Sequence, residues 1–173
     1  MAETGGLELR LIQPSDKLTG LSTGHADFQP LKTFIQRDAK NFHQQNLART
    51  YGLFDGLSLV GYLTLVCGEV DANGAGEATP GFRYSHYPAI KIARLLIDAS
   101  LRGKSWDAQL VEFAVGTAKD VICPAVGCRF VVVDAKQQSI GFYERCGFTL
   151  LDTAENRARQ SPVMFLDLHR VAA

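Results

Sequence analysis

The chain has 173 residues, of which 46% are hydrophobic and 21% are charged, so it can bury a core as one compact domain over residues 1–173. Eighteen basic residues balance eighteen acidic ones, which excludes a global field that would draw the protein to nucleic acid or to a membrane. No apolar run reaches the ~20 residues of a membrane span, and no targeting signal precedes the first strand, so we expect a cytoplasmic protein without membrane contact.

The N-terminal third predicts one strand and one helix. Residues 7–12 alternate and indicate an edge strand, and a helix begins at Asp27, a candidate N-cap, with Pro30 in its first turn. Apolar side chains at helical spacing predict a stripe that enters the core, made of Phe28, Leu31, Phe34, Ile35 and Phe42. The opposite face has an excess of basic residues, which indicates either a solvated surface or a patch that binds an acidic substrate. Its charged or titratable residues are Lys32, Arg37, Lys40 and His43, with Asp38 as the one acidic residue.

A β-hairpin and a long loop follow. Residues 48–55 and 57–70 predict two strands joined by a tight turn at Asp55 and Gly56. Residues 71–88 are rich in Gly, Ala and Pro and have no period, which indicates a surface loop or lid. The aromatic end of this loop either lines a substrate entrance or pins the loop to the body of the protein; it consists of Phe82, Tyr84, His86 and Tyr87.

The second half of the chain predicts alternating strands and helices. Residues 89–98 and 129–134 are apolar strands, separated by an amphipathic helix that begins at Asp107 and ends before Pro124. A second helix covers residues 137–145 and stops at Gly147, and two short strands follow at 149–151 and 163–169. Because a strand, helix, strand unit pairs its strands in parallel, we expect an α/β fold with a mixed central sheet of about six to seven strands and flanking helices.

The cysteines and histidines do not suggest a metal site. No C-x-x-C pair or histidine at ligand spacing occurs, so no metal is expected and the cysteines are predicted to be reduced core thiols. The residues concerned are Cys67, Cys123, Cys128 and Cys146, and His25, His43, His86 and His169.

One loop has the features of a phosphate site. Residues 101–107, LRGKSWD, place Arg102 and Lys104 just before a helix, where free N–H groups and the helix dipole suit a pyrophosphate. The alternative is an ordinary polar turn in which Asp107 caps the helix. If the strand ahead of the loop splays from residues 130–134, its backbone can hold an extended amide-bearing arm, and Tyr143 then lies at the end of that arm.

The chain resembles the GCN5-related N-acetyltransferase (GNAT) superfamily, and within it the acetyltransferase toxins of bacterial toxin–antitoxin systems. The resemblance covers residues 7–168 and rests on four segments: DF followed by the first helix, LARTYGLFDGLSLVGYLTL, KIARLLID and VDAKQQSIGFYERCGF. It implies acetyl-CoA as acyl donor and a primary amine as acceptor. It also implies Tyr143 as the general acid for the departing thiolate; a buried aromatic with a satisfied hydroxyl is the structural alternative.

The superfamily motifs imply the remaining site residues. The pyrophosphate loop falls on Arg102, Gly103, Lys104, Ser105, Trp106, Asp107 and Ala108. The backbone of Leu95, Leu96 and Ile97 is implied to bind pantetheine, and Lys136, Ser139 and Phe142 are implied to complete the coenzyme site. Ser105 and Asp107 stand where the superfamily has glycines, and both bear on how tightly the coenzyme binds. A serine forced to a positive φ is strained by ~1 kcal/mol or more, and the Asp107 carboxylate competes with the pyrophosphate.

The toxin resemblance implies the α-amine of aminoacyl-tRNA as acceptor, bound through Lys32, Arg37, Lys40 and Arg49, with Arg157 and Arg159 as further contacts. It further implies a small DNA-binding antitoxin as partner and leaves a homodimer open. Two alternatives remain: a housekeeping acetyltransferase for a small-molecule or protein amine, and a degenerate domain that serves as a binding or regulatory module.

Overall fold

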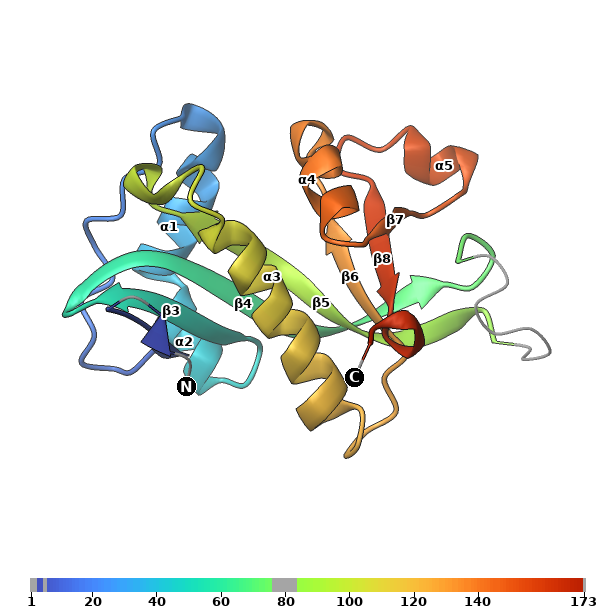
Figure 1. Cartoon of the computed structure of the whole chain (residues 1–173), viewed down its shortest axis with the longest axis horizontal. Coiled ribbons are helices and arrows are strands. Elements are labelled where there is room, and N and C mark those ends of the chain that lie inside the picture. Colours follow the sequence, from blue (N-terminus) through green and yellow to red (C-terminus); the bar gives the residue numbers. More distant parts are fainter. Residues whose placement is uncertain (1–2, 5, 76–83, 173) are drawn as a thin grey trace. The chain divides into compact units, whose positions relative to one another are not determined.

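The computed structural model describes residues 3–4, 6–75 and 84–172. These residues fall into two compact units: unit 1 comprises Met1–Val66 and Ala93–Leu110, and unit 2 comprises Cys67–Ile92 and Val111–Ala173. One mixed sheet of eight strands has the order β1-β2-β3-β4-β5-β6-β8-β7 (Figure 1). This sheet, with its flanking helices, confirms the predicted α/β class, whereas the assignment of the whole chain to one domain stays a prediction.

The strands of unit 1 pair in an antiparallel manner. They are β1 (Glu3–Thr4), β2 (Leu7–Leu11), β3 (Arg49–Asp55) and the first part of β4 (Ser58–Asp71). The predicted edge position of β2 was wrong, because β1 pairs with its outer side. The predicted hairpin is confirmed, but the pairing of Asp55 with Ser58 moves its two-residue turn to Gly56 and Leu57. Gly56 has φ 57°, a conformation that glycine adopts without strain.

The predicted first helix divides into three pieces: a 3₁₀ turn at Ala26–Phe28, α1 (Gln29–Arg37) and α2 (Ala39–Gln44). The predicted N-cap role of Asp27 was wrong, because Asp27 lies inside the 3₁₀ turn and its own N–H is capped by Nδ1 of His25 at 3.1 Å. Pro30 does lie in the first turn of α1, where its missing N–H costs nothing.

The apolar stripe of α1 and α2 enters the core of unit 1 as predicted. Phe34 and Ile35 are buried with Leu96 and Tyr62, and the other three members of the stripe pack against this cluster. The Tyr62 hydroxyl donates to the carbonyl oxygen of Leu31 at 2.6 Å, which satisfies its buried polar group. Packing on α1 and α2 therefore fixes the face of the sheet that carries Tyr62 and Leu96.

Unit 2 contains the parallel pair that the sequence predicted. β5 (His86–Ile97) and β6 (Phe130–Asp134) run parallel, with a register from Ala89 opposite Phe130 to Ile92 opposite Val133. β8 (Val163–Asp167) is antiparallel to β6, and β7 (Thr149–Leu150) closes the far edge of the sheet (Figure 1).

The later helices follow the predicted order. α3 (Trp106–Thr117) continues as a π-helical turn, Ala118–Ile122, and stops before Pro124. A 3₁₀ turn at Gln137–Ser139 leads into α4 (Ile140–Arg145), which ends near Gly147 at φ 94°. α5 (Ala154–Arg157) was not predicted, because a four-residue helix has no apolar period to detect.

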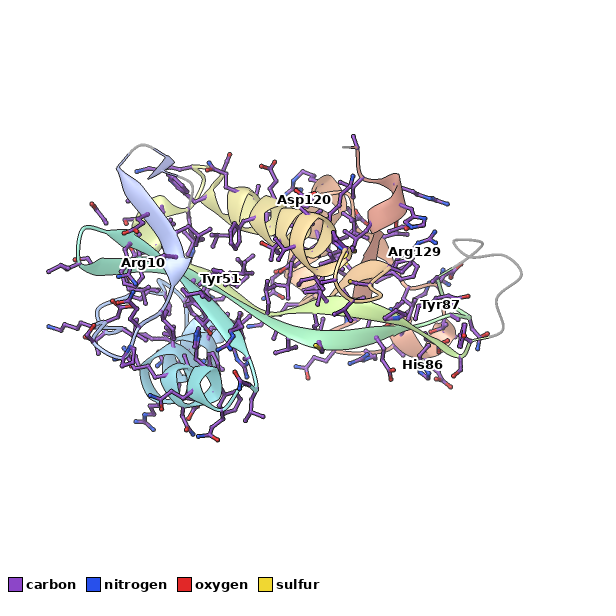
Figure 2. All side chains as sticks on the ribbon, turned by 90° about the horizontal axis from the view of Figure 1, so that it is seen from below. Arg10, Tyr51, His86, Tyr87, Asp120 and Arg129 are labelled. Atoms are coloured by element: carbon purple, nitrogen blue, oxygen red, sulfur yellow. The ribbon has the colours of Figure 1, made fainter. Side chains whose placement is uncertain are left out.

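The long loop after β4 is shorter than predicted, because β4 reaches Asp71 and β5 starts at His86. Tyr87 is buried, and its ring centroid lies 5.9 Å from that of Phe130. Figure 2 shows Tyr87 near Arg129, which is paired with the buried Asp167. Tyr87 therefore pins the end of the loop rather than lining an entrance, whereas the predicted contribution of Phe82 lies outside the described residues.

The predicted burial of the cysteines was wrong. Cys67 is exposed and the other three cysteines are half-buried; none of the four forms a disulfide. Among the residues described, no cluster of three or more His, Cys, Asp or Glu side chains could hold a metal ion. Within the same part of the chain, no helix has the length and apolar character needed to cross a membrane.

Candidate active site

The basic loop of unit 1 connects the end of β5 to the N-terminus of α3. After Ile97 the chain forms a 3₁₀ turn at Ala99–Leu101, and α3 begins at Trp106. Gly103 and Ser105 both have positive φ, 76° and 63°. Glycine adopts this conformation freely, but serine is strained by ~1 kcal/mol or more. The loop thus has two residues at positive φ, one glycine and one serine, directly before the N-terminus of α3.

Asp98 holds this loop in place, a role that the sequence did not reveal. Its carboxylate accepts hydrogen bonds from the N–H of Ser22 at 2.7 Å and from the N–H of Ser100 at 3.0 Å. Burial opposes ionisation of Asp98, but the two main-chain donors, the Ser100 hydroxyl and the charge of Arg102 together outweigh it, so the pKa of the carboxyl is lowered. An aspartate at the end of a strand and two residues before a serine is a recognisable signal of such a turn.

Arg102 is directed toward a neighbouring loop of the same unit. Its guanidinium donates to the carbonyl oxygen of Thr23 and lies 4.6 Å from the centroid of the Phe28 ring. Lys104 is exposed, as Arg102 is, but it makes no such contact among the described residues. Arg102 therefore anchors the loop, while Lys104 adds a positive charge just before the N-terminus of α3.

Asp107 is not the N-cap of the helix. It is the second residue of α3, and its Oδ1 accepts a hydrogen bond from the N–H of Ala108 at 2.9 Å. The predicted cap was wrong because the helix starts one residue earlier, at Trp106. The carboxylate nevertheless occupies one of the N–H groups that a phosphate would use, and it adds a negative charge at the same place.

We expect Asp107→Gly to tighten the binding of acetyl-CoA and to lower the thermal stability slightly. The substitution removes the competing anion, and it also removes a favourable charge and a hydrogen bond from the first helical turn, worth ~1 kcal/mol. Asp107→Asn is the matched control, because it removes the charge and keeps an oxygen that can accept from Ala108. Calorimetric titration and thermal unfolding measure the two effects. Weaker binding in both variants would show that the carboxylate does not oppose the coenzyme.

The end of β5 offers main-chain groups next to the loop. In the described residues the parallel register with β6 ends at Ile92, whereas β5 continues for five residues to Ile97. Leu96 and Ile97 are buried and Leu95 is half-buried. Trp106 and Ala108 are also half-buried, so the first turn of α3 is partly exposed to solvent.

The remaining predicted site residues lie in unit 2, at and before α4. Lys136 precedes the 3₁₀ turn and its carbonyl accepts from the N–H of Ser139 at 2.8 Å. Tyr143 is buried, with its ring centroid 4.9 Å from that of Phe142 and 5.5 Å from that of Phe148. Both ring pairs are edge-to-face, so packing fixes the direction of the Tyr143 side chain.

The four predicted substrate contacts differ in how they are held. The ammonium of Lys40 donates to the carbonyl oxygens of Pro14 at 2.8 Å and Asp16 at 2.5 Å. Arg49 donates to the carbonyl of His43 at 2.9 Å and to Oδ1 of Asn46 at 2.7 Å. Both side chains therefore use hydrogen-bond donors for contacts within the protein. Two further cations lie on α1: Lys32, half-exposed, and Arg37, exposed.

Comparison with known families gives one match, to the model described as the acetyltransferase (GNAT) family, over residues 22–148. The chain belongs to this family. The match covers most of the chain, including the loop before α3 and the whole of α4, and GNAT proteins are acetyltransferases. The chain is therefore an acyl-CoA N-acyltransferase by family, as the sequence predicted. A comparison with curated protein sequences gave no match.

Solved structures of GNAT toxins share the fold. A bacterial toxin is 20% identical with a TM-score of 0.82 and covers 94% of this chain and 91% of its own. AtaT complexed with acetyl-methionyl-tRNAfMet is 23% identical with a TM-score of 0.79, over 94% and 95%. A tyrosine-to-phenylalanine variant of AtaT, bound to the C-terminus of the antitoxin AtaR and to acetyl-CoA, is 21% identical with a TM-score of 0.75, over 95% and 94%.

Proposed function

We propose that this GNAT protein moves acetyl from acetyl-CoA to the α-amine of an aminoacyl-tRNA and acts in the cytoplasm as the toxin of a toxin–antitoxin pair. The observation that carries the proposal is the full-length likeness to AtaT, which was solved with acetyl-methionyl-tRNAfMet. The likeness extends over 94% of this chain and 95% of AtaT.

The loop of unit 1 fits a coenzyme pyrophosphate. Its two residues at positive φ, Gly103 and Ser105, shape the turn, and the N-terminus of α3 follows directly. Lys104 adds an exposed charge, and Leu95, Leu96 and Ile97 offer main-chain groups to the pantetheine arm. Asp107, in the first turn of α3, carries a charge that opposes an anion there, so we expect weaker binding than a glycine at this position would give.

The chemistry needs few protein groups. An unprotonated amine attacks the thioester carbonyl, main-chain N–H groups stabilise the oxyanion, and an acid protonates the departing thiolate. We assign the last role to Tyr143. A phenol with an ordinary pKa near 10 can protonate a thiolate of similar basicity. Lys136, Ser139 and Phe142 precede it and are proposed to support the coenzyme.

The proposed partner is an antitoxin. AtaT was solved with the C-terminus of the antitoxin AtaR, and the same kind of partner is proposed for this chain. A homodimer, which the sequence left open, stays a prediction.

A small-molecule or protein amine is the second candidate for the acceptor. The net charge of zero favours it, and so does the engagement of Lys40 and Arg49 in internal hydrogen bonds, which leaves few cations of the basic face available for phosphate. The two candidates differ in their dependence on salt, because counterions are released only when a protein binds a polyanion.

If charged tRNA is the acceptor, the rate of transfer at subsaturating tRNA should fall steeply between low and physiological salt. Replacing Lys32 and Arg37 together by alanine should lower that rate and flatten its salt dependence, since neither cation is hydrogen-bonded to another part of the chain among the described residues. Lys17→Ala, an exposed lysine outside the basic face, is the control. A rate that changes neither with salt nor with the double replacement would favour a small-molecule or protein amine as the acceptor.

A further inference from the structure

Arg94 differs from every other arginine that stacks on a ring in the described part of the chain. Four arginines lie over aromatic rings: Arg10 over Phe54, Arg94 over Phe34, Arg102 over Phe28 and Arg129 over Phe130. Three of these guanidinium groups also donate to a protein oxygen, on Asp16, Thr23 and Asp167. Among the residues described, Arg94 has no such acceptor. Its guanidinium carbon lies 3.7 Å from the centroid of the Phe34 ring, the shortest of the four distances.

Within the described part of the chain, the stacking leaves the hydrogen-bonding edge of Arg94 without a protein partner. A guanidinium has five N–H donors in its plane, and a ring beneath that plane satisfies none of them. Arg94 is half-buried, so part of this residue stays accessible to solvent and to a ligand. The ring of Phe34 is itself held by an edge-to-face contact with Phe42 at 5.5 Å. The guanidinium is thus held in position before any ligand arrives.

No carboxylate of the described residues forms an ion pair with Arg94. The Tyr62 hydroxyl is committed to the carbonyl of Leu31, and burial raises the pKa of this phenol, so it stays neutral. Helix α1, which carries Phe34, has Lys32 and Arg37 and no acidic residue. The surroundings therefore favour an anion at the free edge of Arg94.

The position of Arg94 on β5 separates it from the pantetheine side. Side chains alternate along a strand, so Arg94 and Leu96 share the face that packs on α1, whereas Leu95 and Ile97 point to the other face. The main chain of this same segment is the proposed pantetheine contact. Because the coenzyme phosphates are proposed to bind at the loop before α3, an anion on the Arg94 side would come from the acyl acceptor.

We propose that Arg94 is a substrate-binding residue that holds a phosphate group of the acceptor by a bidentate, charge-assisted pair. The inference rests on the proposed function, since aminoacyl-tRNA is an amine that carries phosphodiesters. Arginine suits this role better than lysine, because its planar fork matches two oxygens of a phosphate at once.

A direct test follows the Nε–H signal of Arg94 by NMR while inorganic phosphate is added to the full chain saturated with CoA. The CoA occupies the loop before α3, and Arg94→Lys identifies the signal. We expect this signal to shift saturably with phosphate, whereas those of Arg10 and Arg129, already paired with carboxylates, stay in place. An Arg94 signal that phosphate leaves unchanged would overturn the inference.

Kinetics of transfer to charged tRNA give a second measurement. Arg94→Gln should raise the KM for the acceptor by about 10-fold or more, the loss expected for a charge-assisted hydrogen bond, and Arg94→Lys should recover part of it. The KM for acetyl-CoA should not change. The matched control is Arg145→Gln, an exposed arginine of α4. An unchanged KM in a folded Arg94→Gln protein would refute the role of Arg94 and leave the proposed reaction standing. Failure of the wild type to acetylate any charged tRNA would refute the proposed reaction, and the phosphate titration would still decide the role of Arg94.

Discussion

Replacing Tyr143 by phenylalanine should lower the turnover of acetyl transfer by about 100-fold or more, the effect expected for losing a positioned general acid. The fold should persist, because the ring contacts of Tyr143 with Phe142 and Phe148 need no hydroxyl. Affinity for acetyl-CoA should persist as well, since only one oxygen is removed.

Single-turnover and steady-state rates measure this effect, and thermal unfolding checks the fold. Tyr84→Phe is the matched control, because Tyr84 is 67% exposed and is assigned neither to the coenzyme site nor to proton transfer. Undiminished turnover in the Tyr143 variant would make this residue structural and would assign protonation of the thiolate to water.

Reversing the charge of Arg102 and Lys104 together should weaken the binding of acetyl-CoA by about 100-fold or more, because two cations become two anions beside a pyrophosphate. Part of the loss of affinity will come from a change in the conformation of the loop, since the replacement of Arg102 removes its hydrogen bond to Thr23 and its stacking on Phe28. The single variant Lys104→Glu isolates the electrostatic part, because Lys104 is exposed.

Calorimetric titration measures both variants against Lys17→Glu, which reverses an exposed charge elsewhere in unit 1. Equal affinity in the wild type and the double variant would move the coenzyme away from this loop.

The order of strands and helices could be predicted from the sequence, because the long periodic patterns of apolar residues correspond to the buried faces of these elements. The stripe that includes Phe34 and Ile35 enters the core as predicted, and the two apolar runs around α3 pair in parallel. Helix starts were less readable. Asp27 and Asp107 are both good cap residues, yet each lies one or more residues inside a helical turn, where the same side chain can bind a neighbouring N–H.

Long-range partners of polar side chains were not readable at all. A charge pattern places Lys40 and Arg49 on a basic face, but it cannot show that their hydrogens go to main-chain oxygens. Asn156, likewise, is buried and joins Leu151 to Val163 through three hydrogen bonds, which only the tertiary fold brings together. For Arg94 the sequence contained one indication of a special role, namely that an arginine lies within an otherwise apolar strand.

The most direct test of the proposed reaction is to incubate the purified protein with acetyl-CoA and a set of charged tRNAs, hydrolyse the ester bond, and identify the released amino acids by mass spectrometry. We predict N-acetylated amino acid from at least one charged tRNA, and none when the same amino acid is supplied free. No acetylated product from any charged tRNA, with acetyl transfer to a small or protein amine under the same conditions, would contradict the assignment of aminoacyl-tRNA as the acceptor.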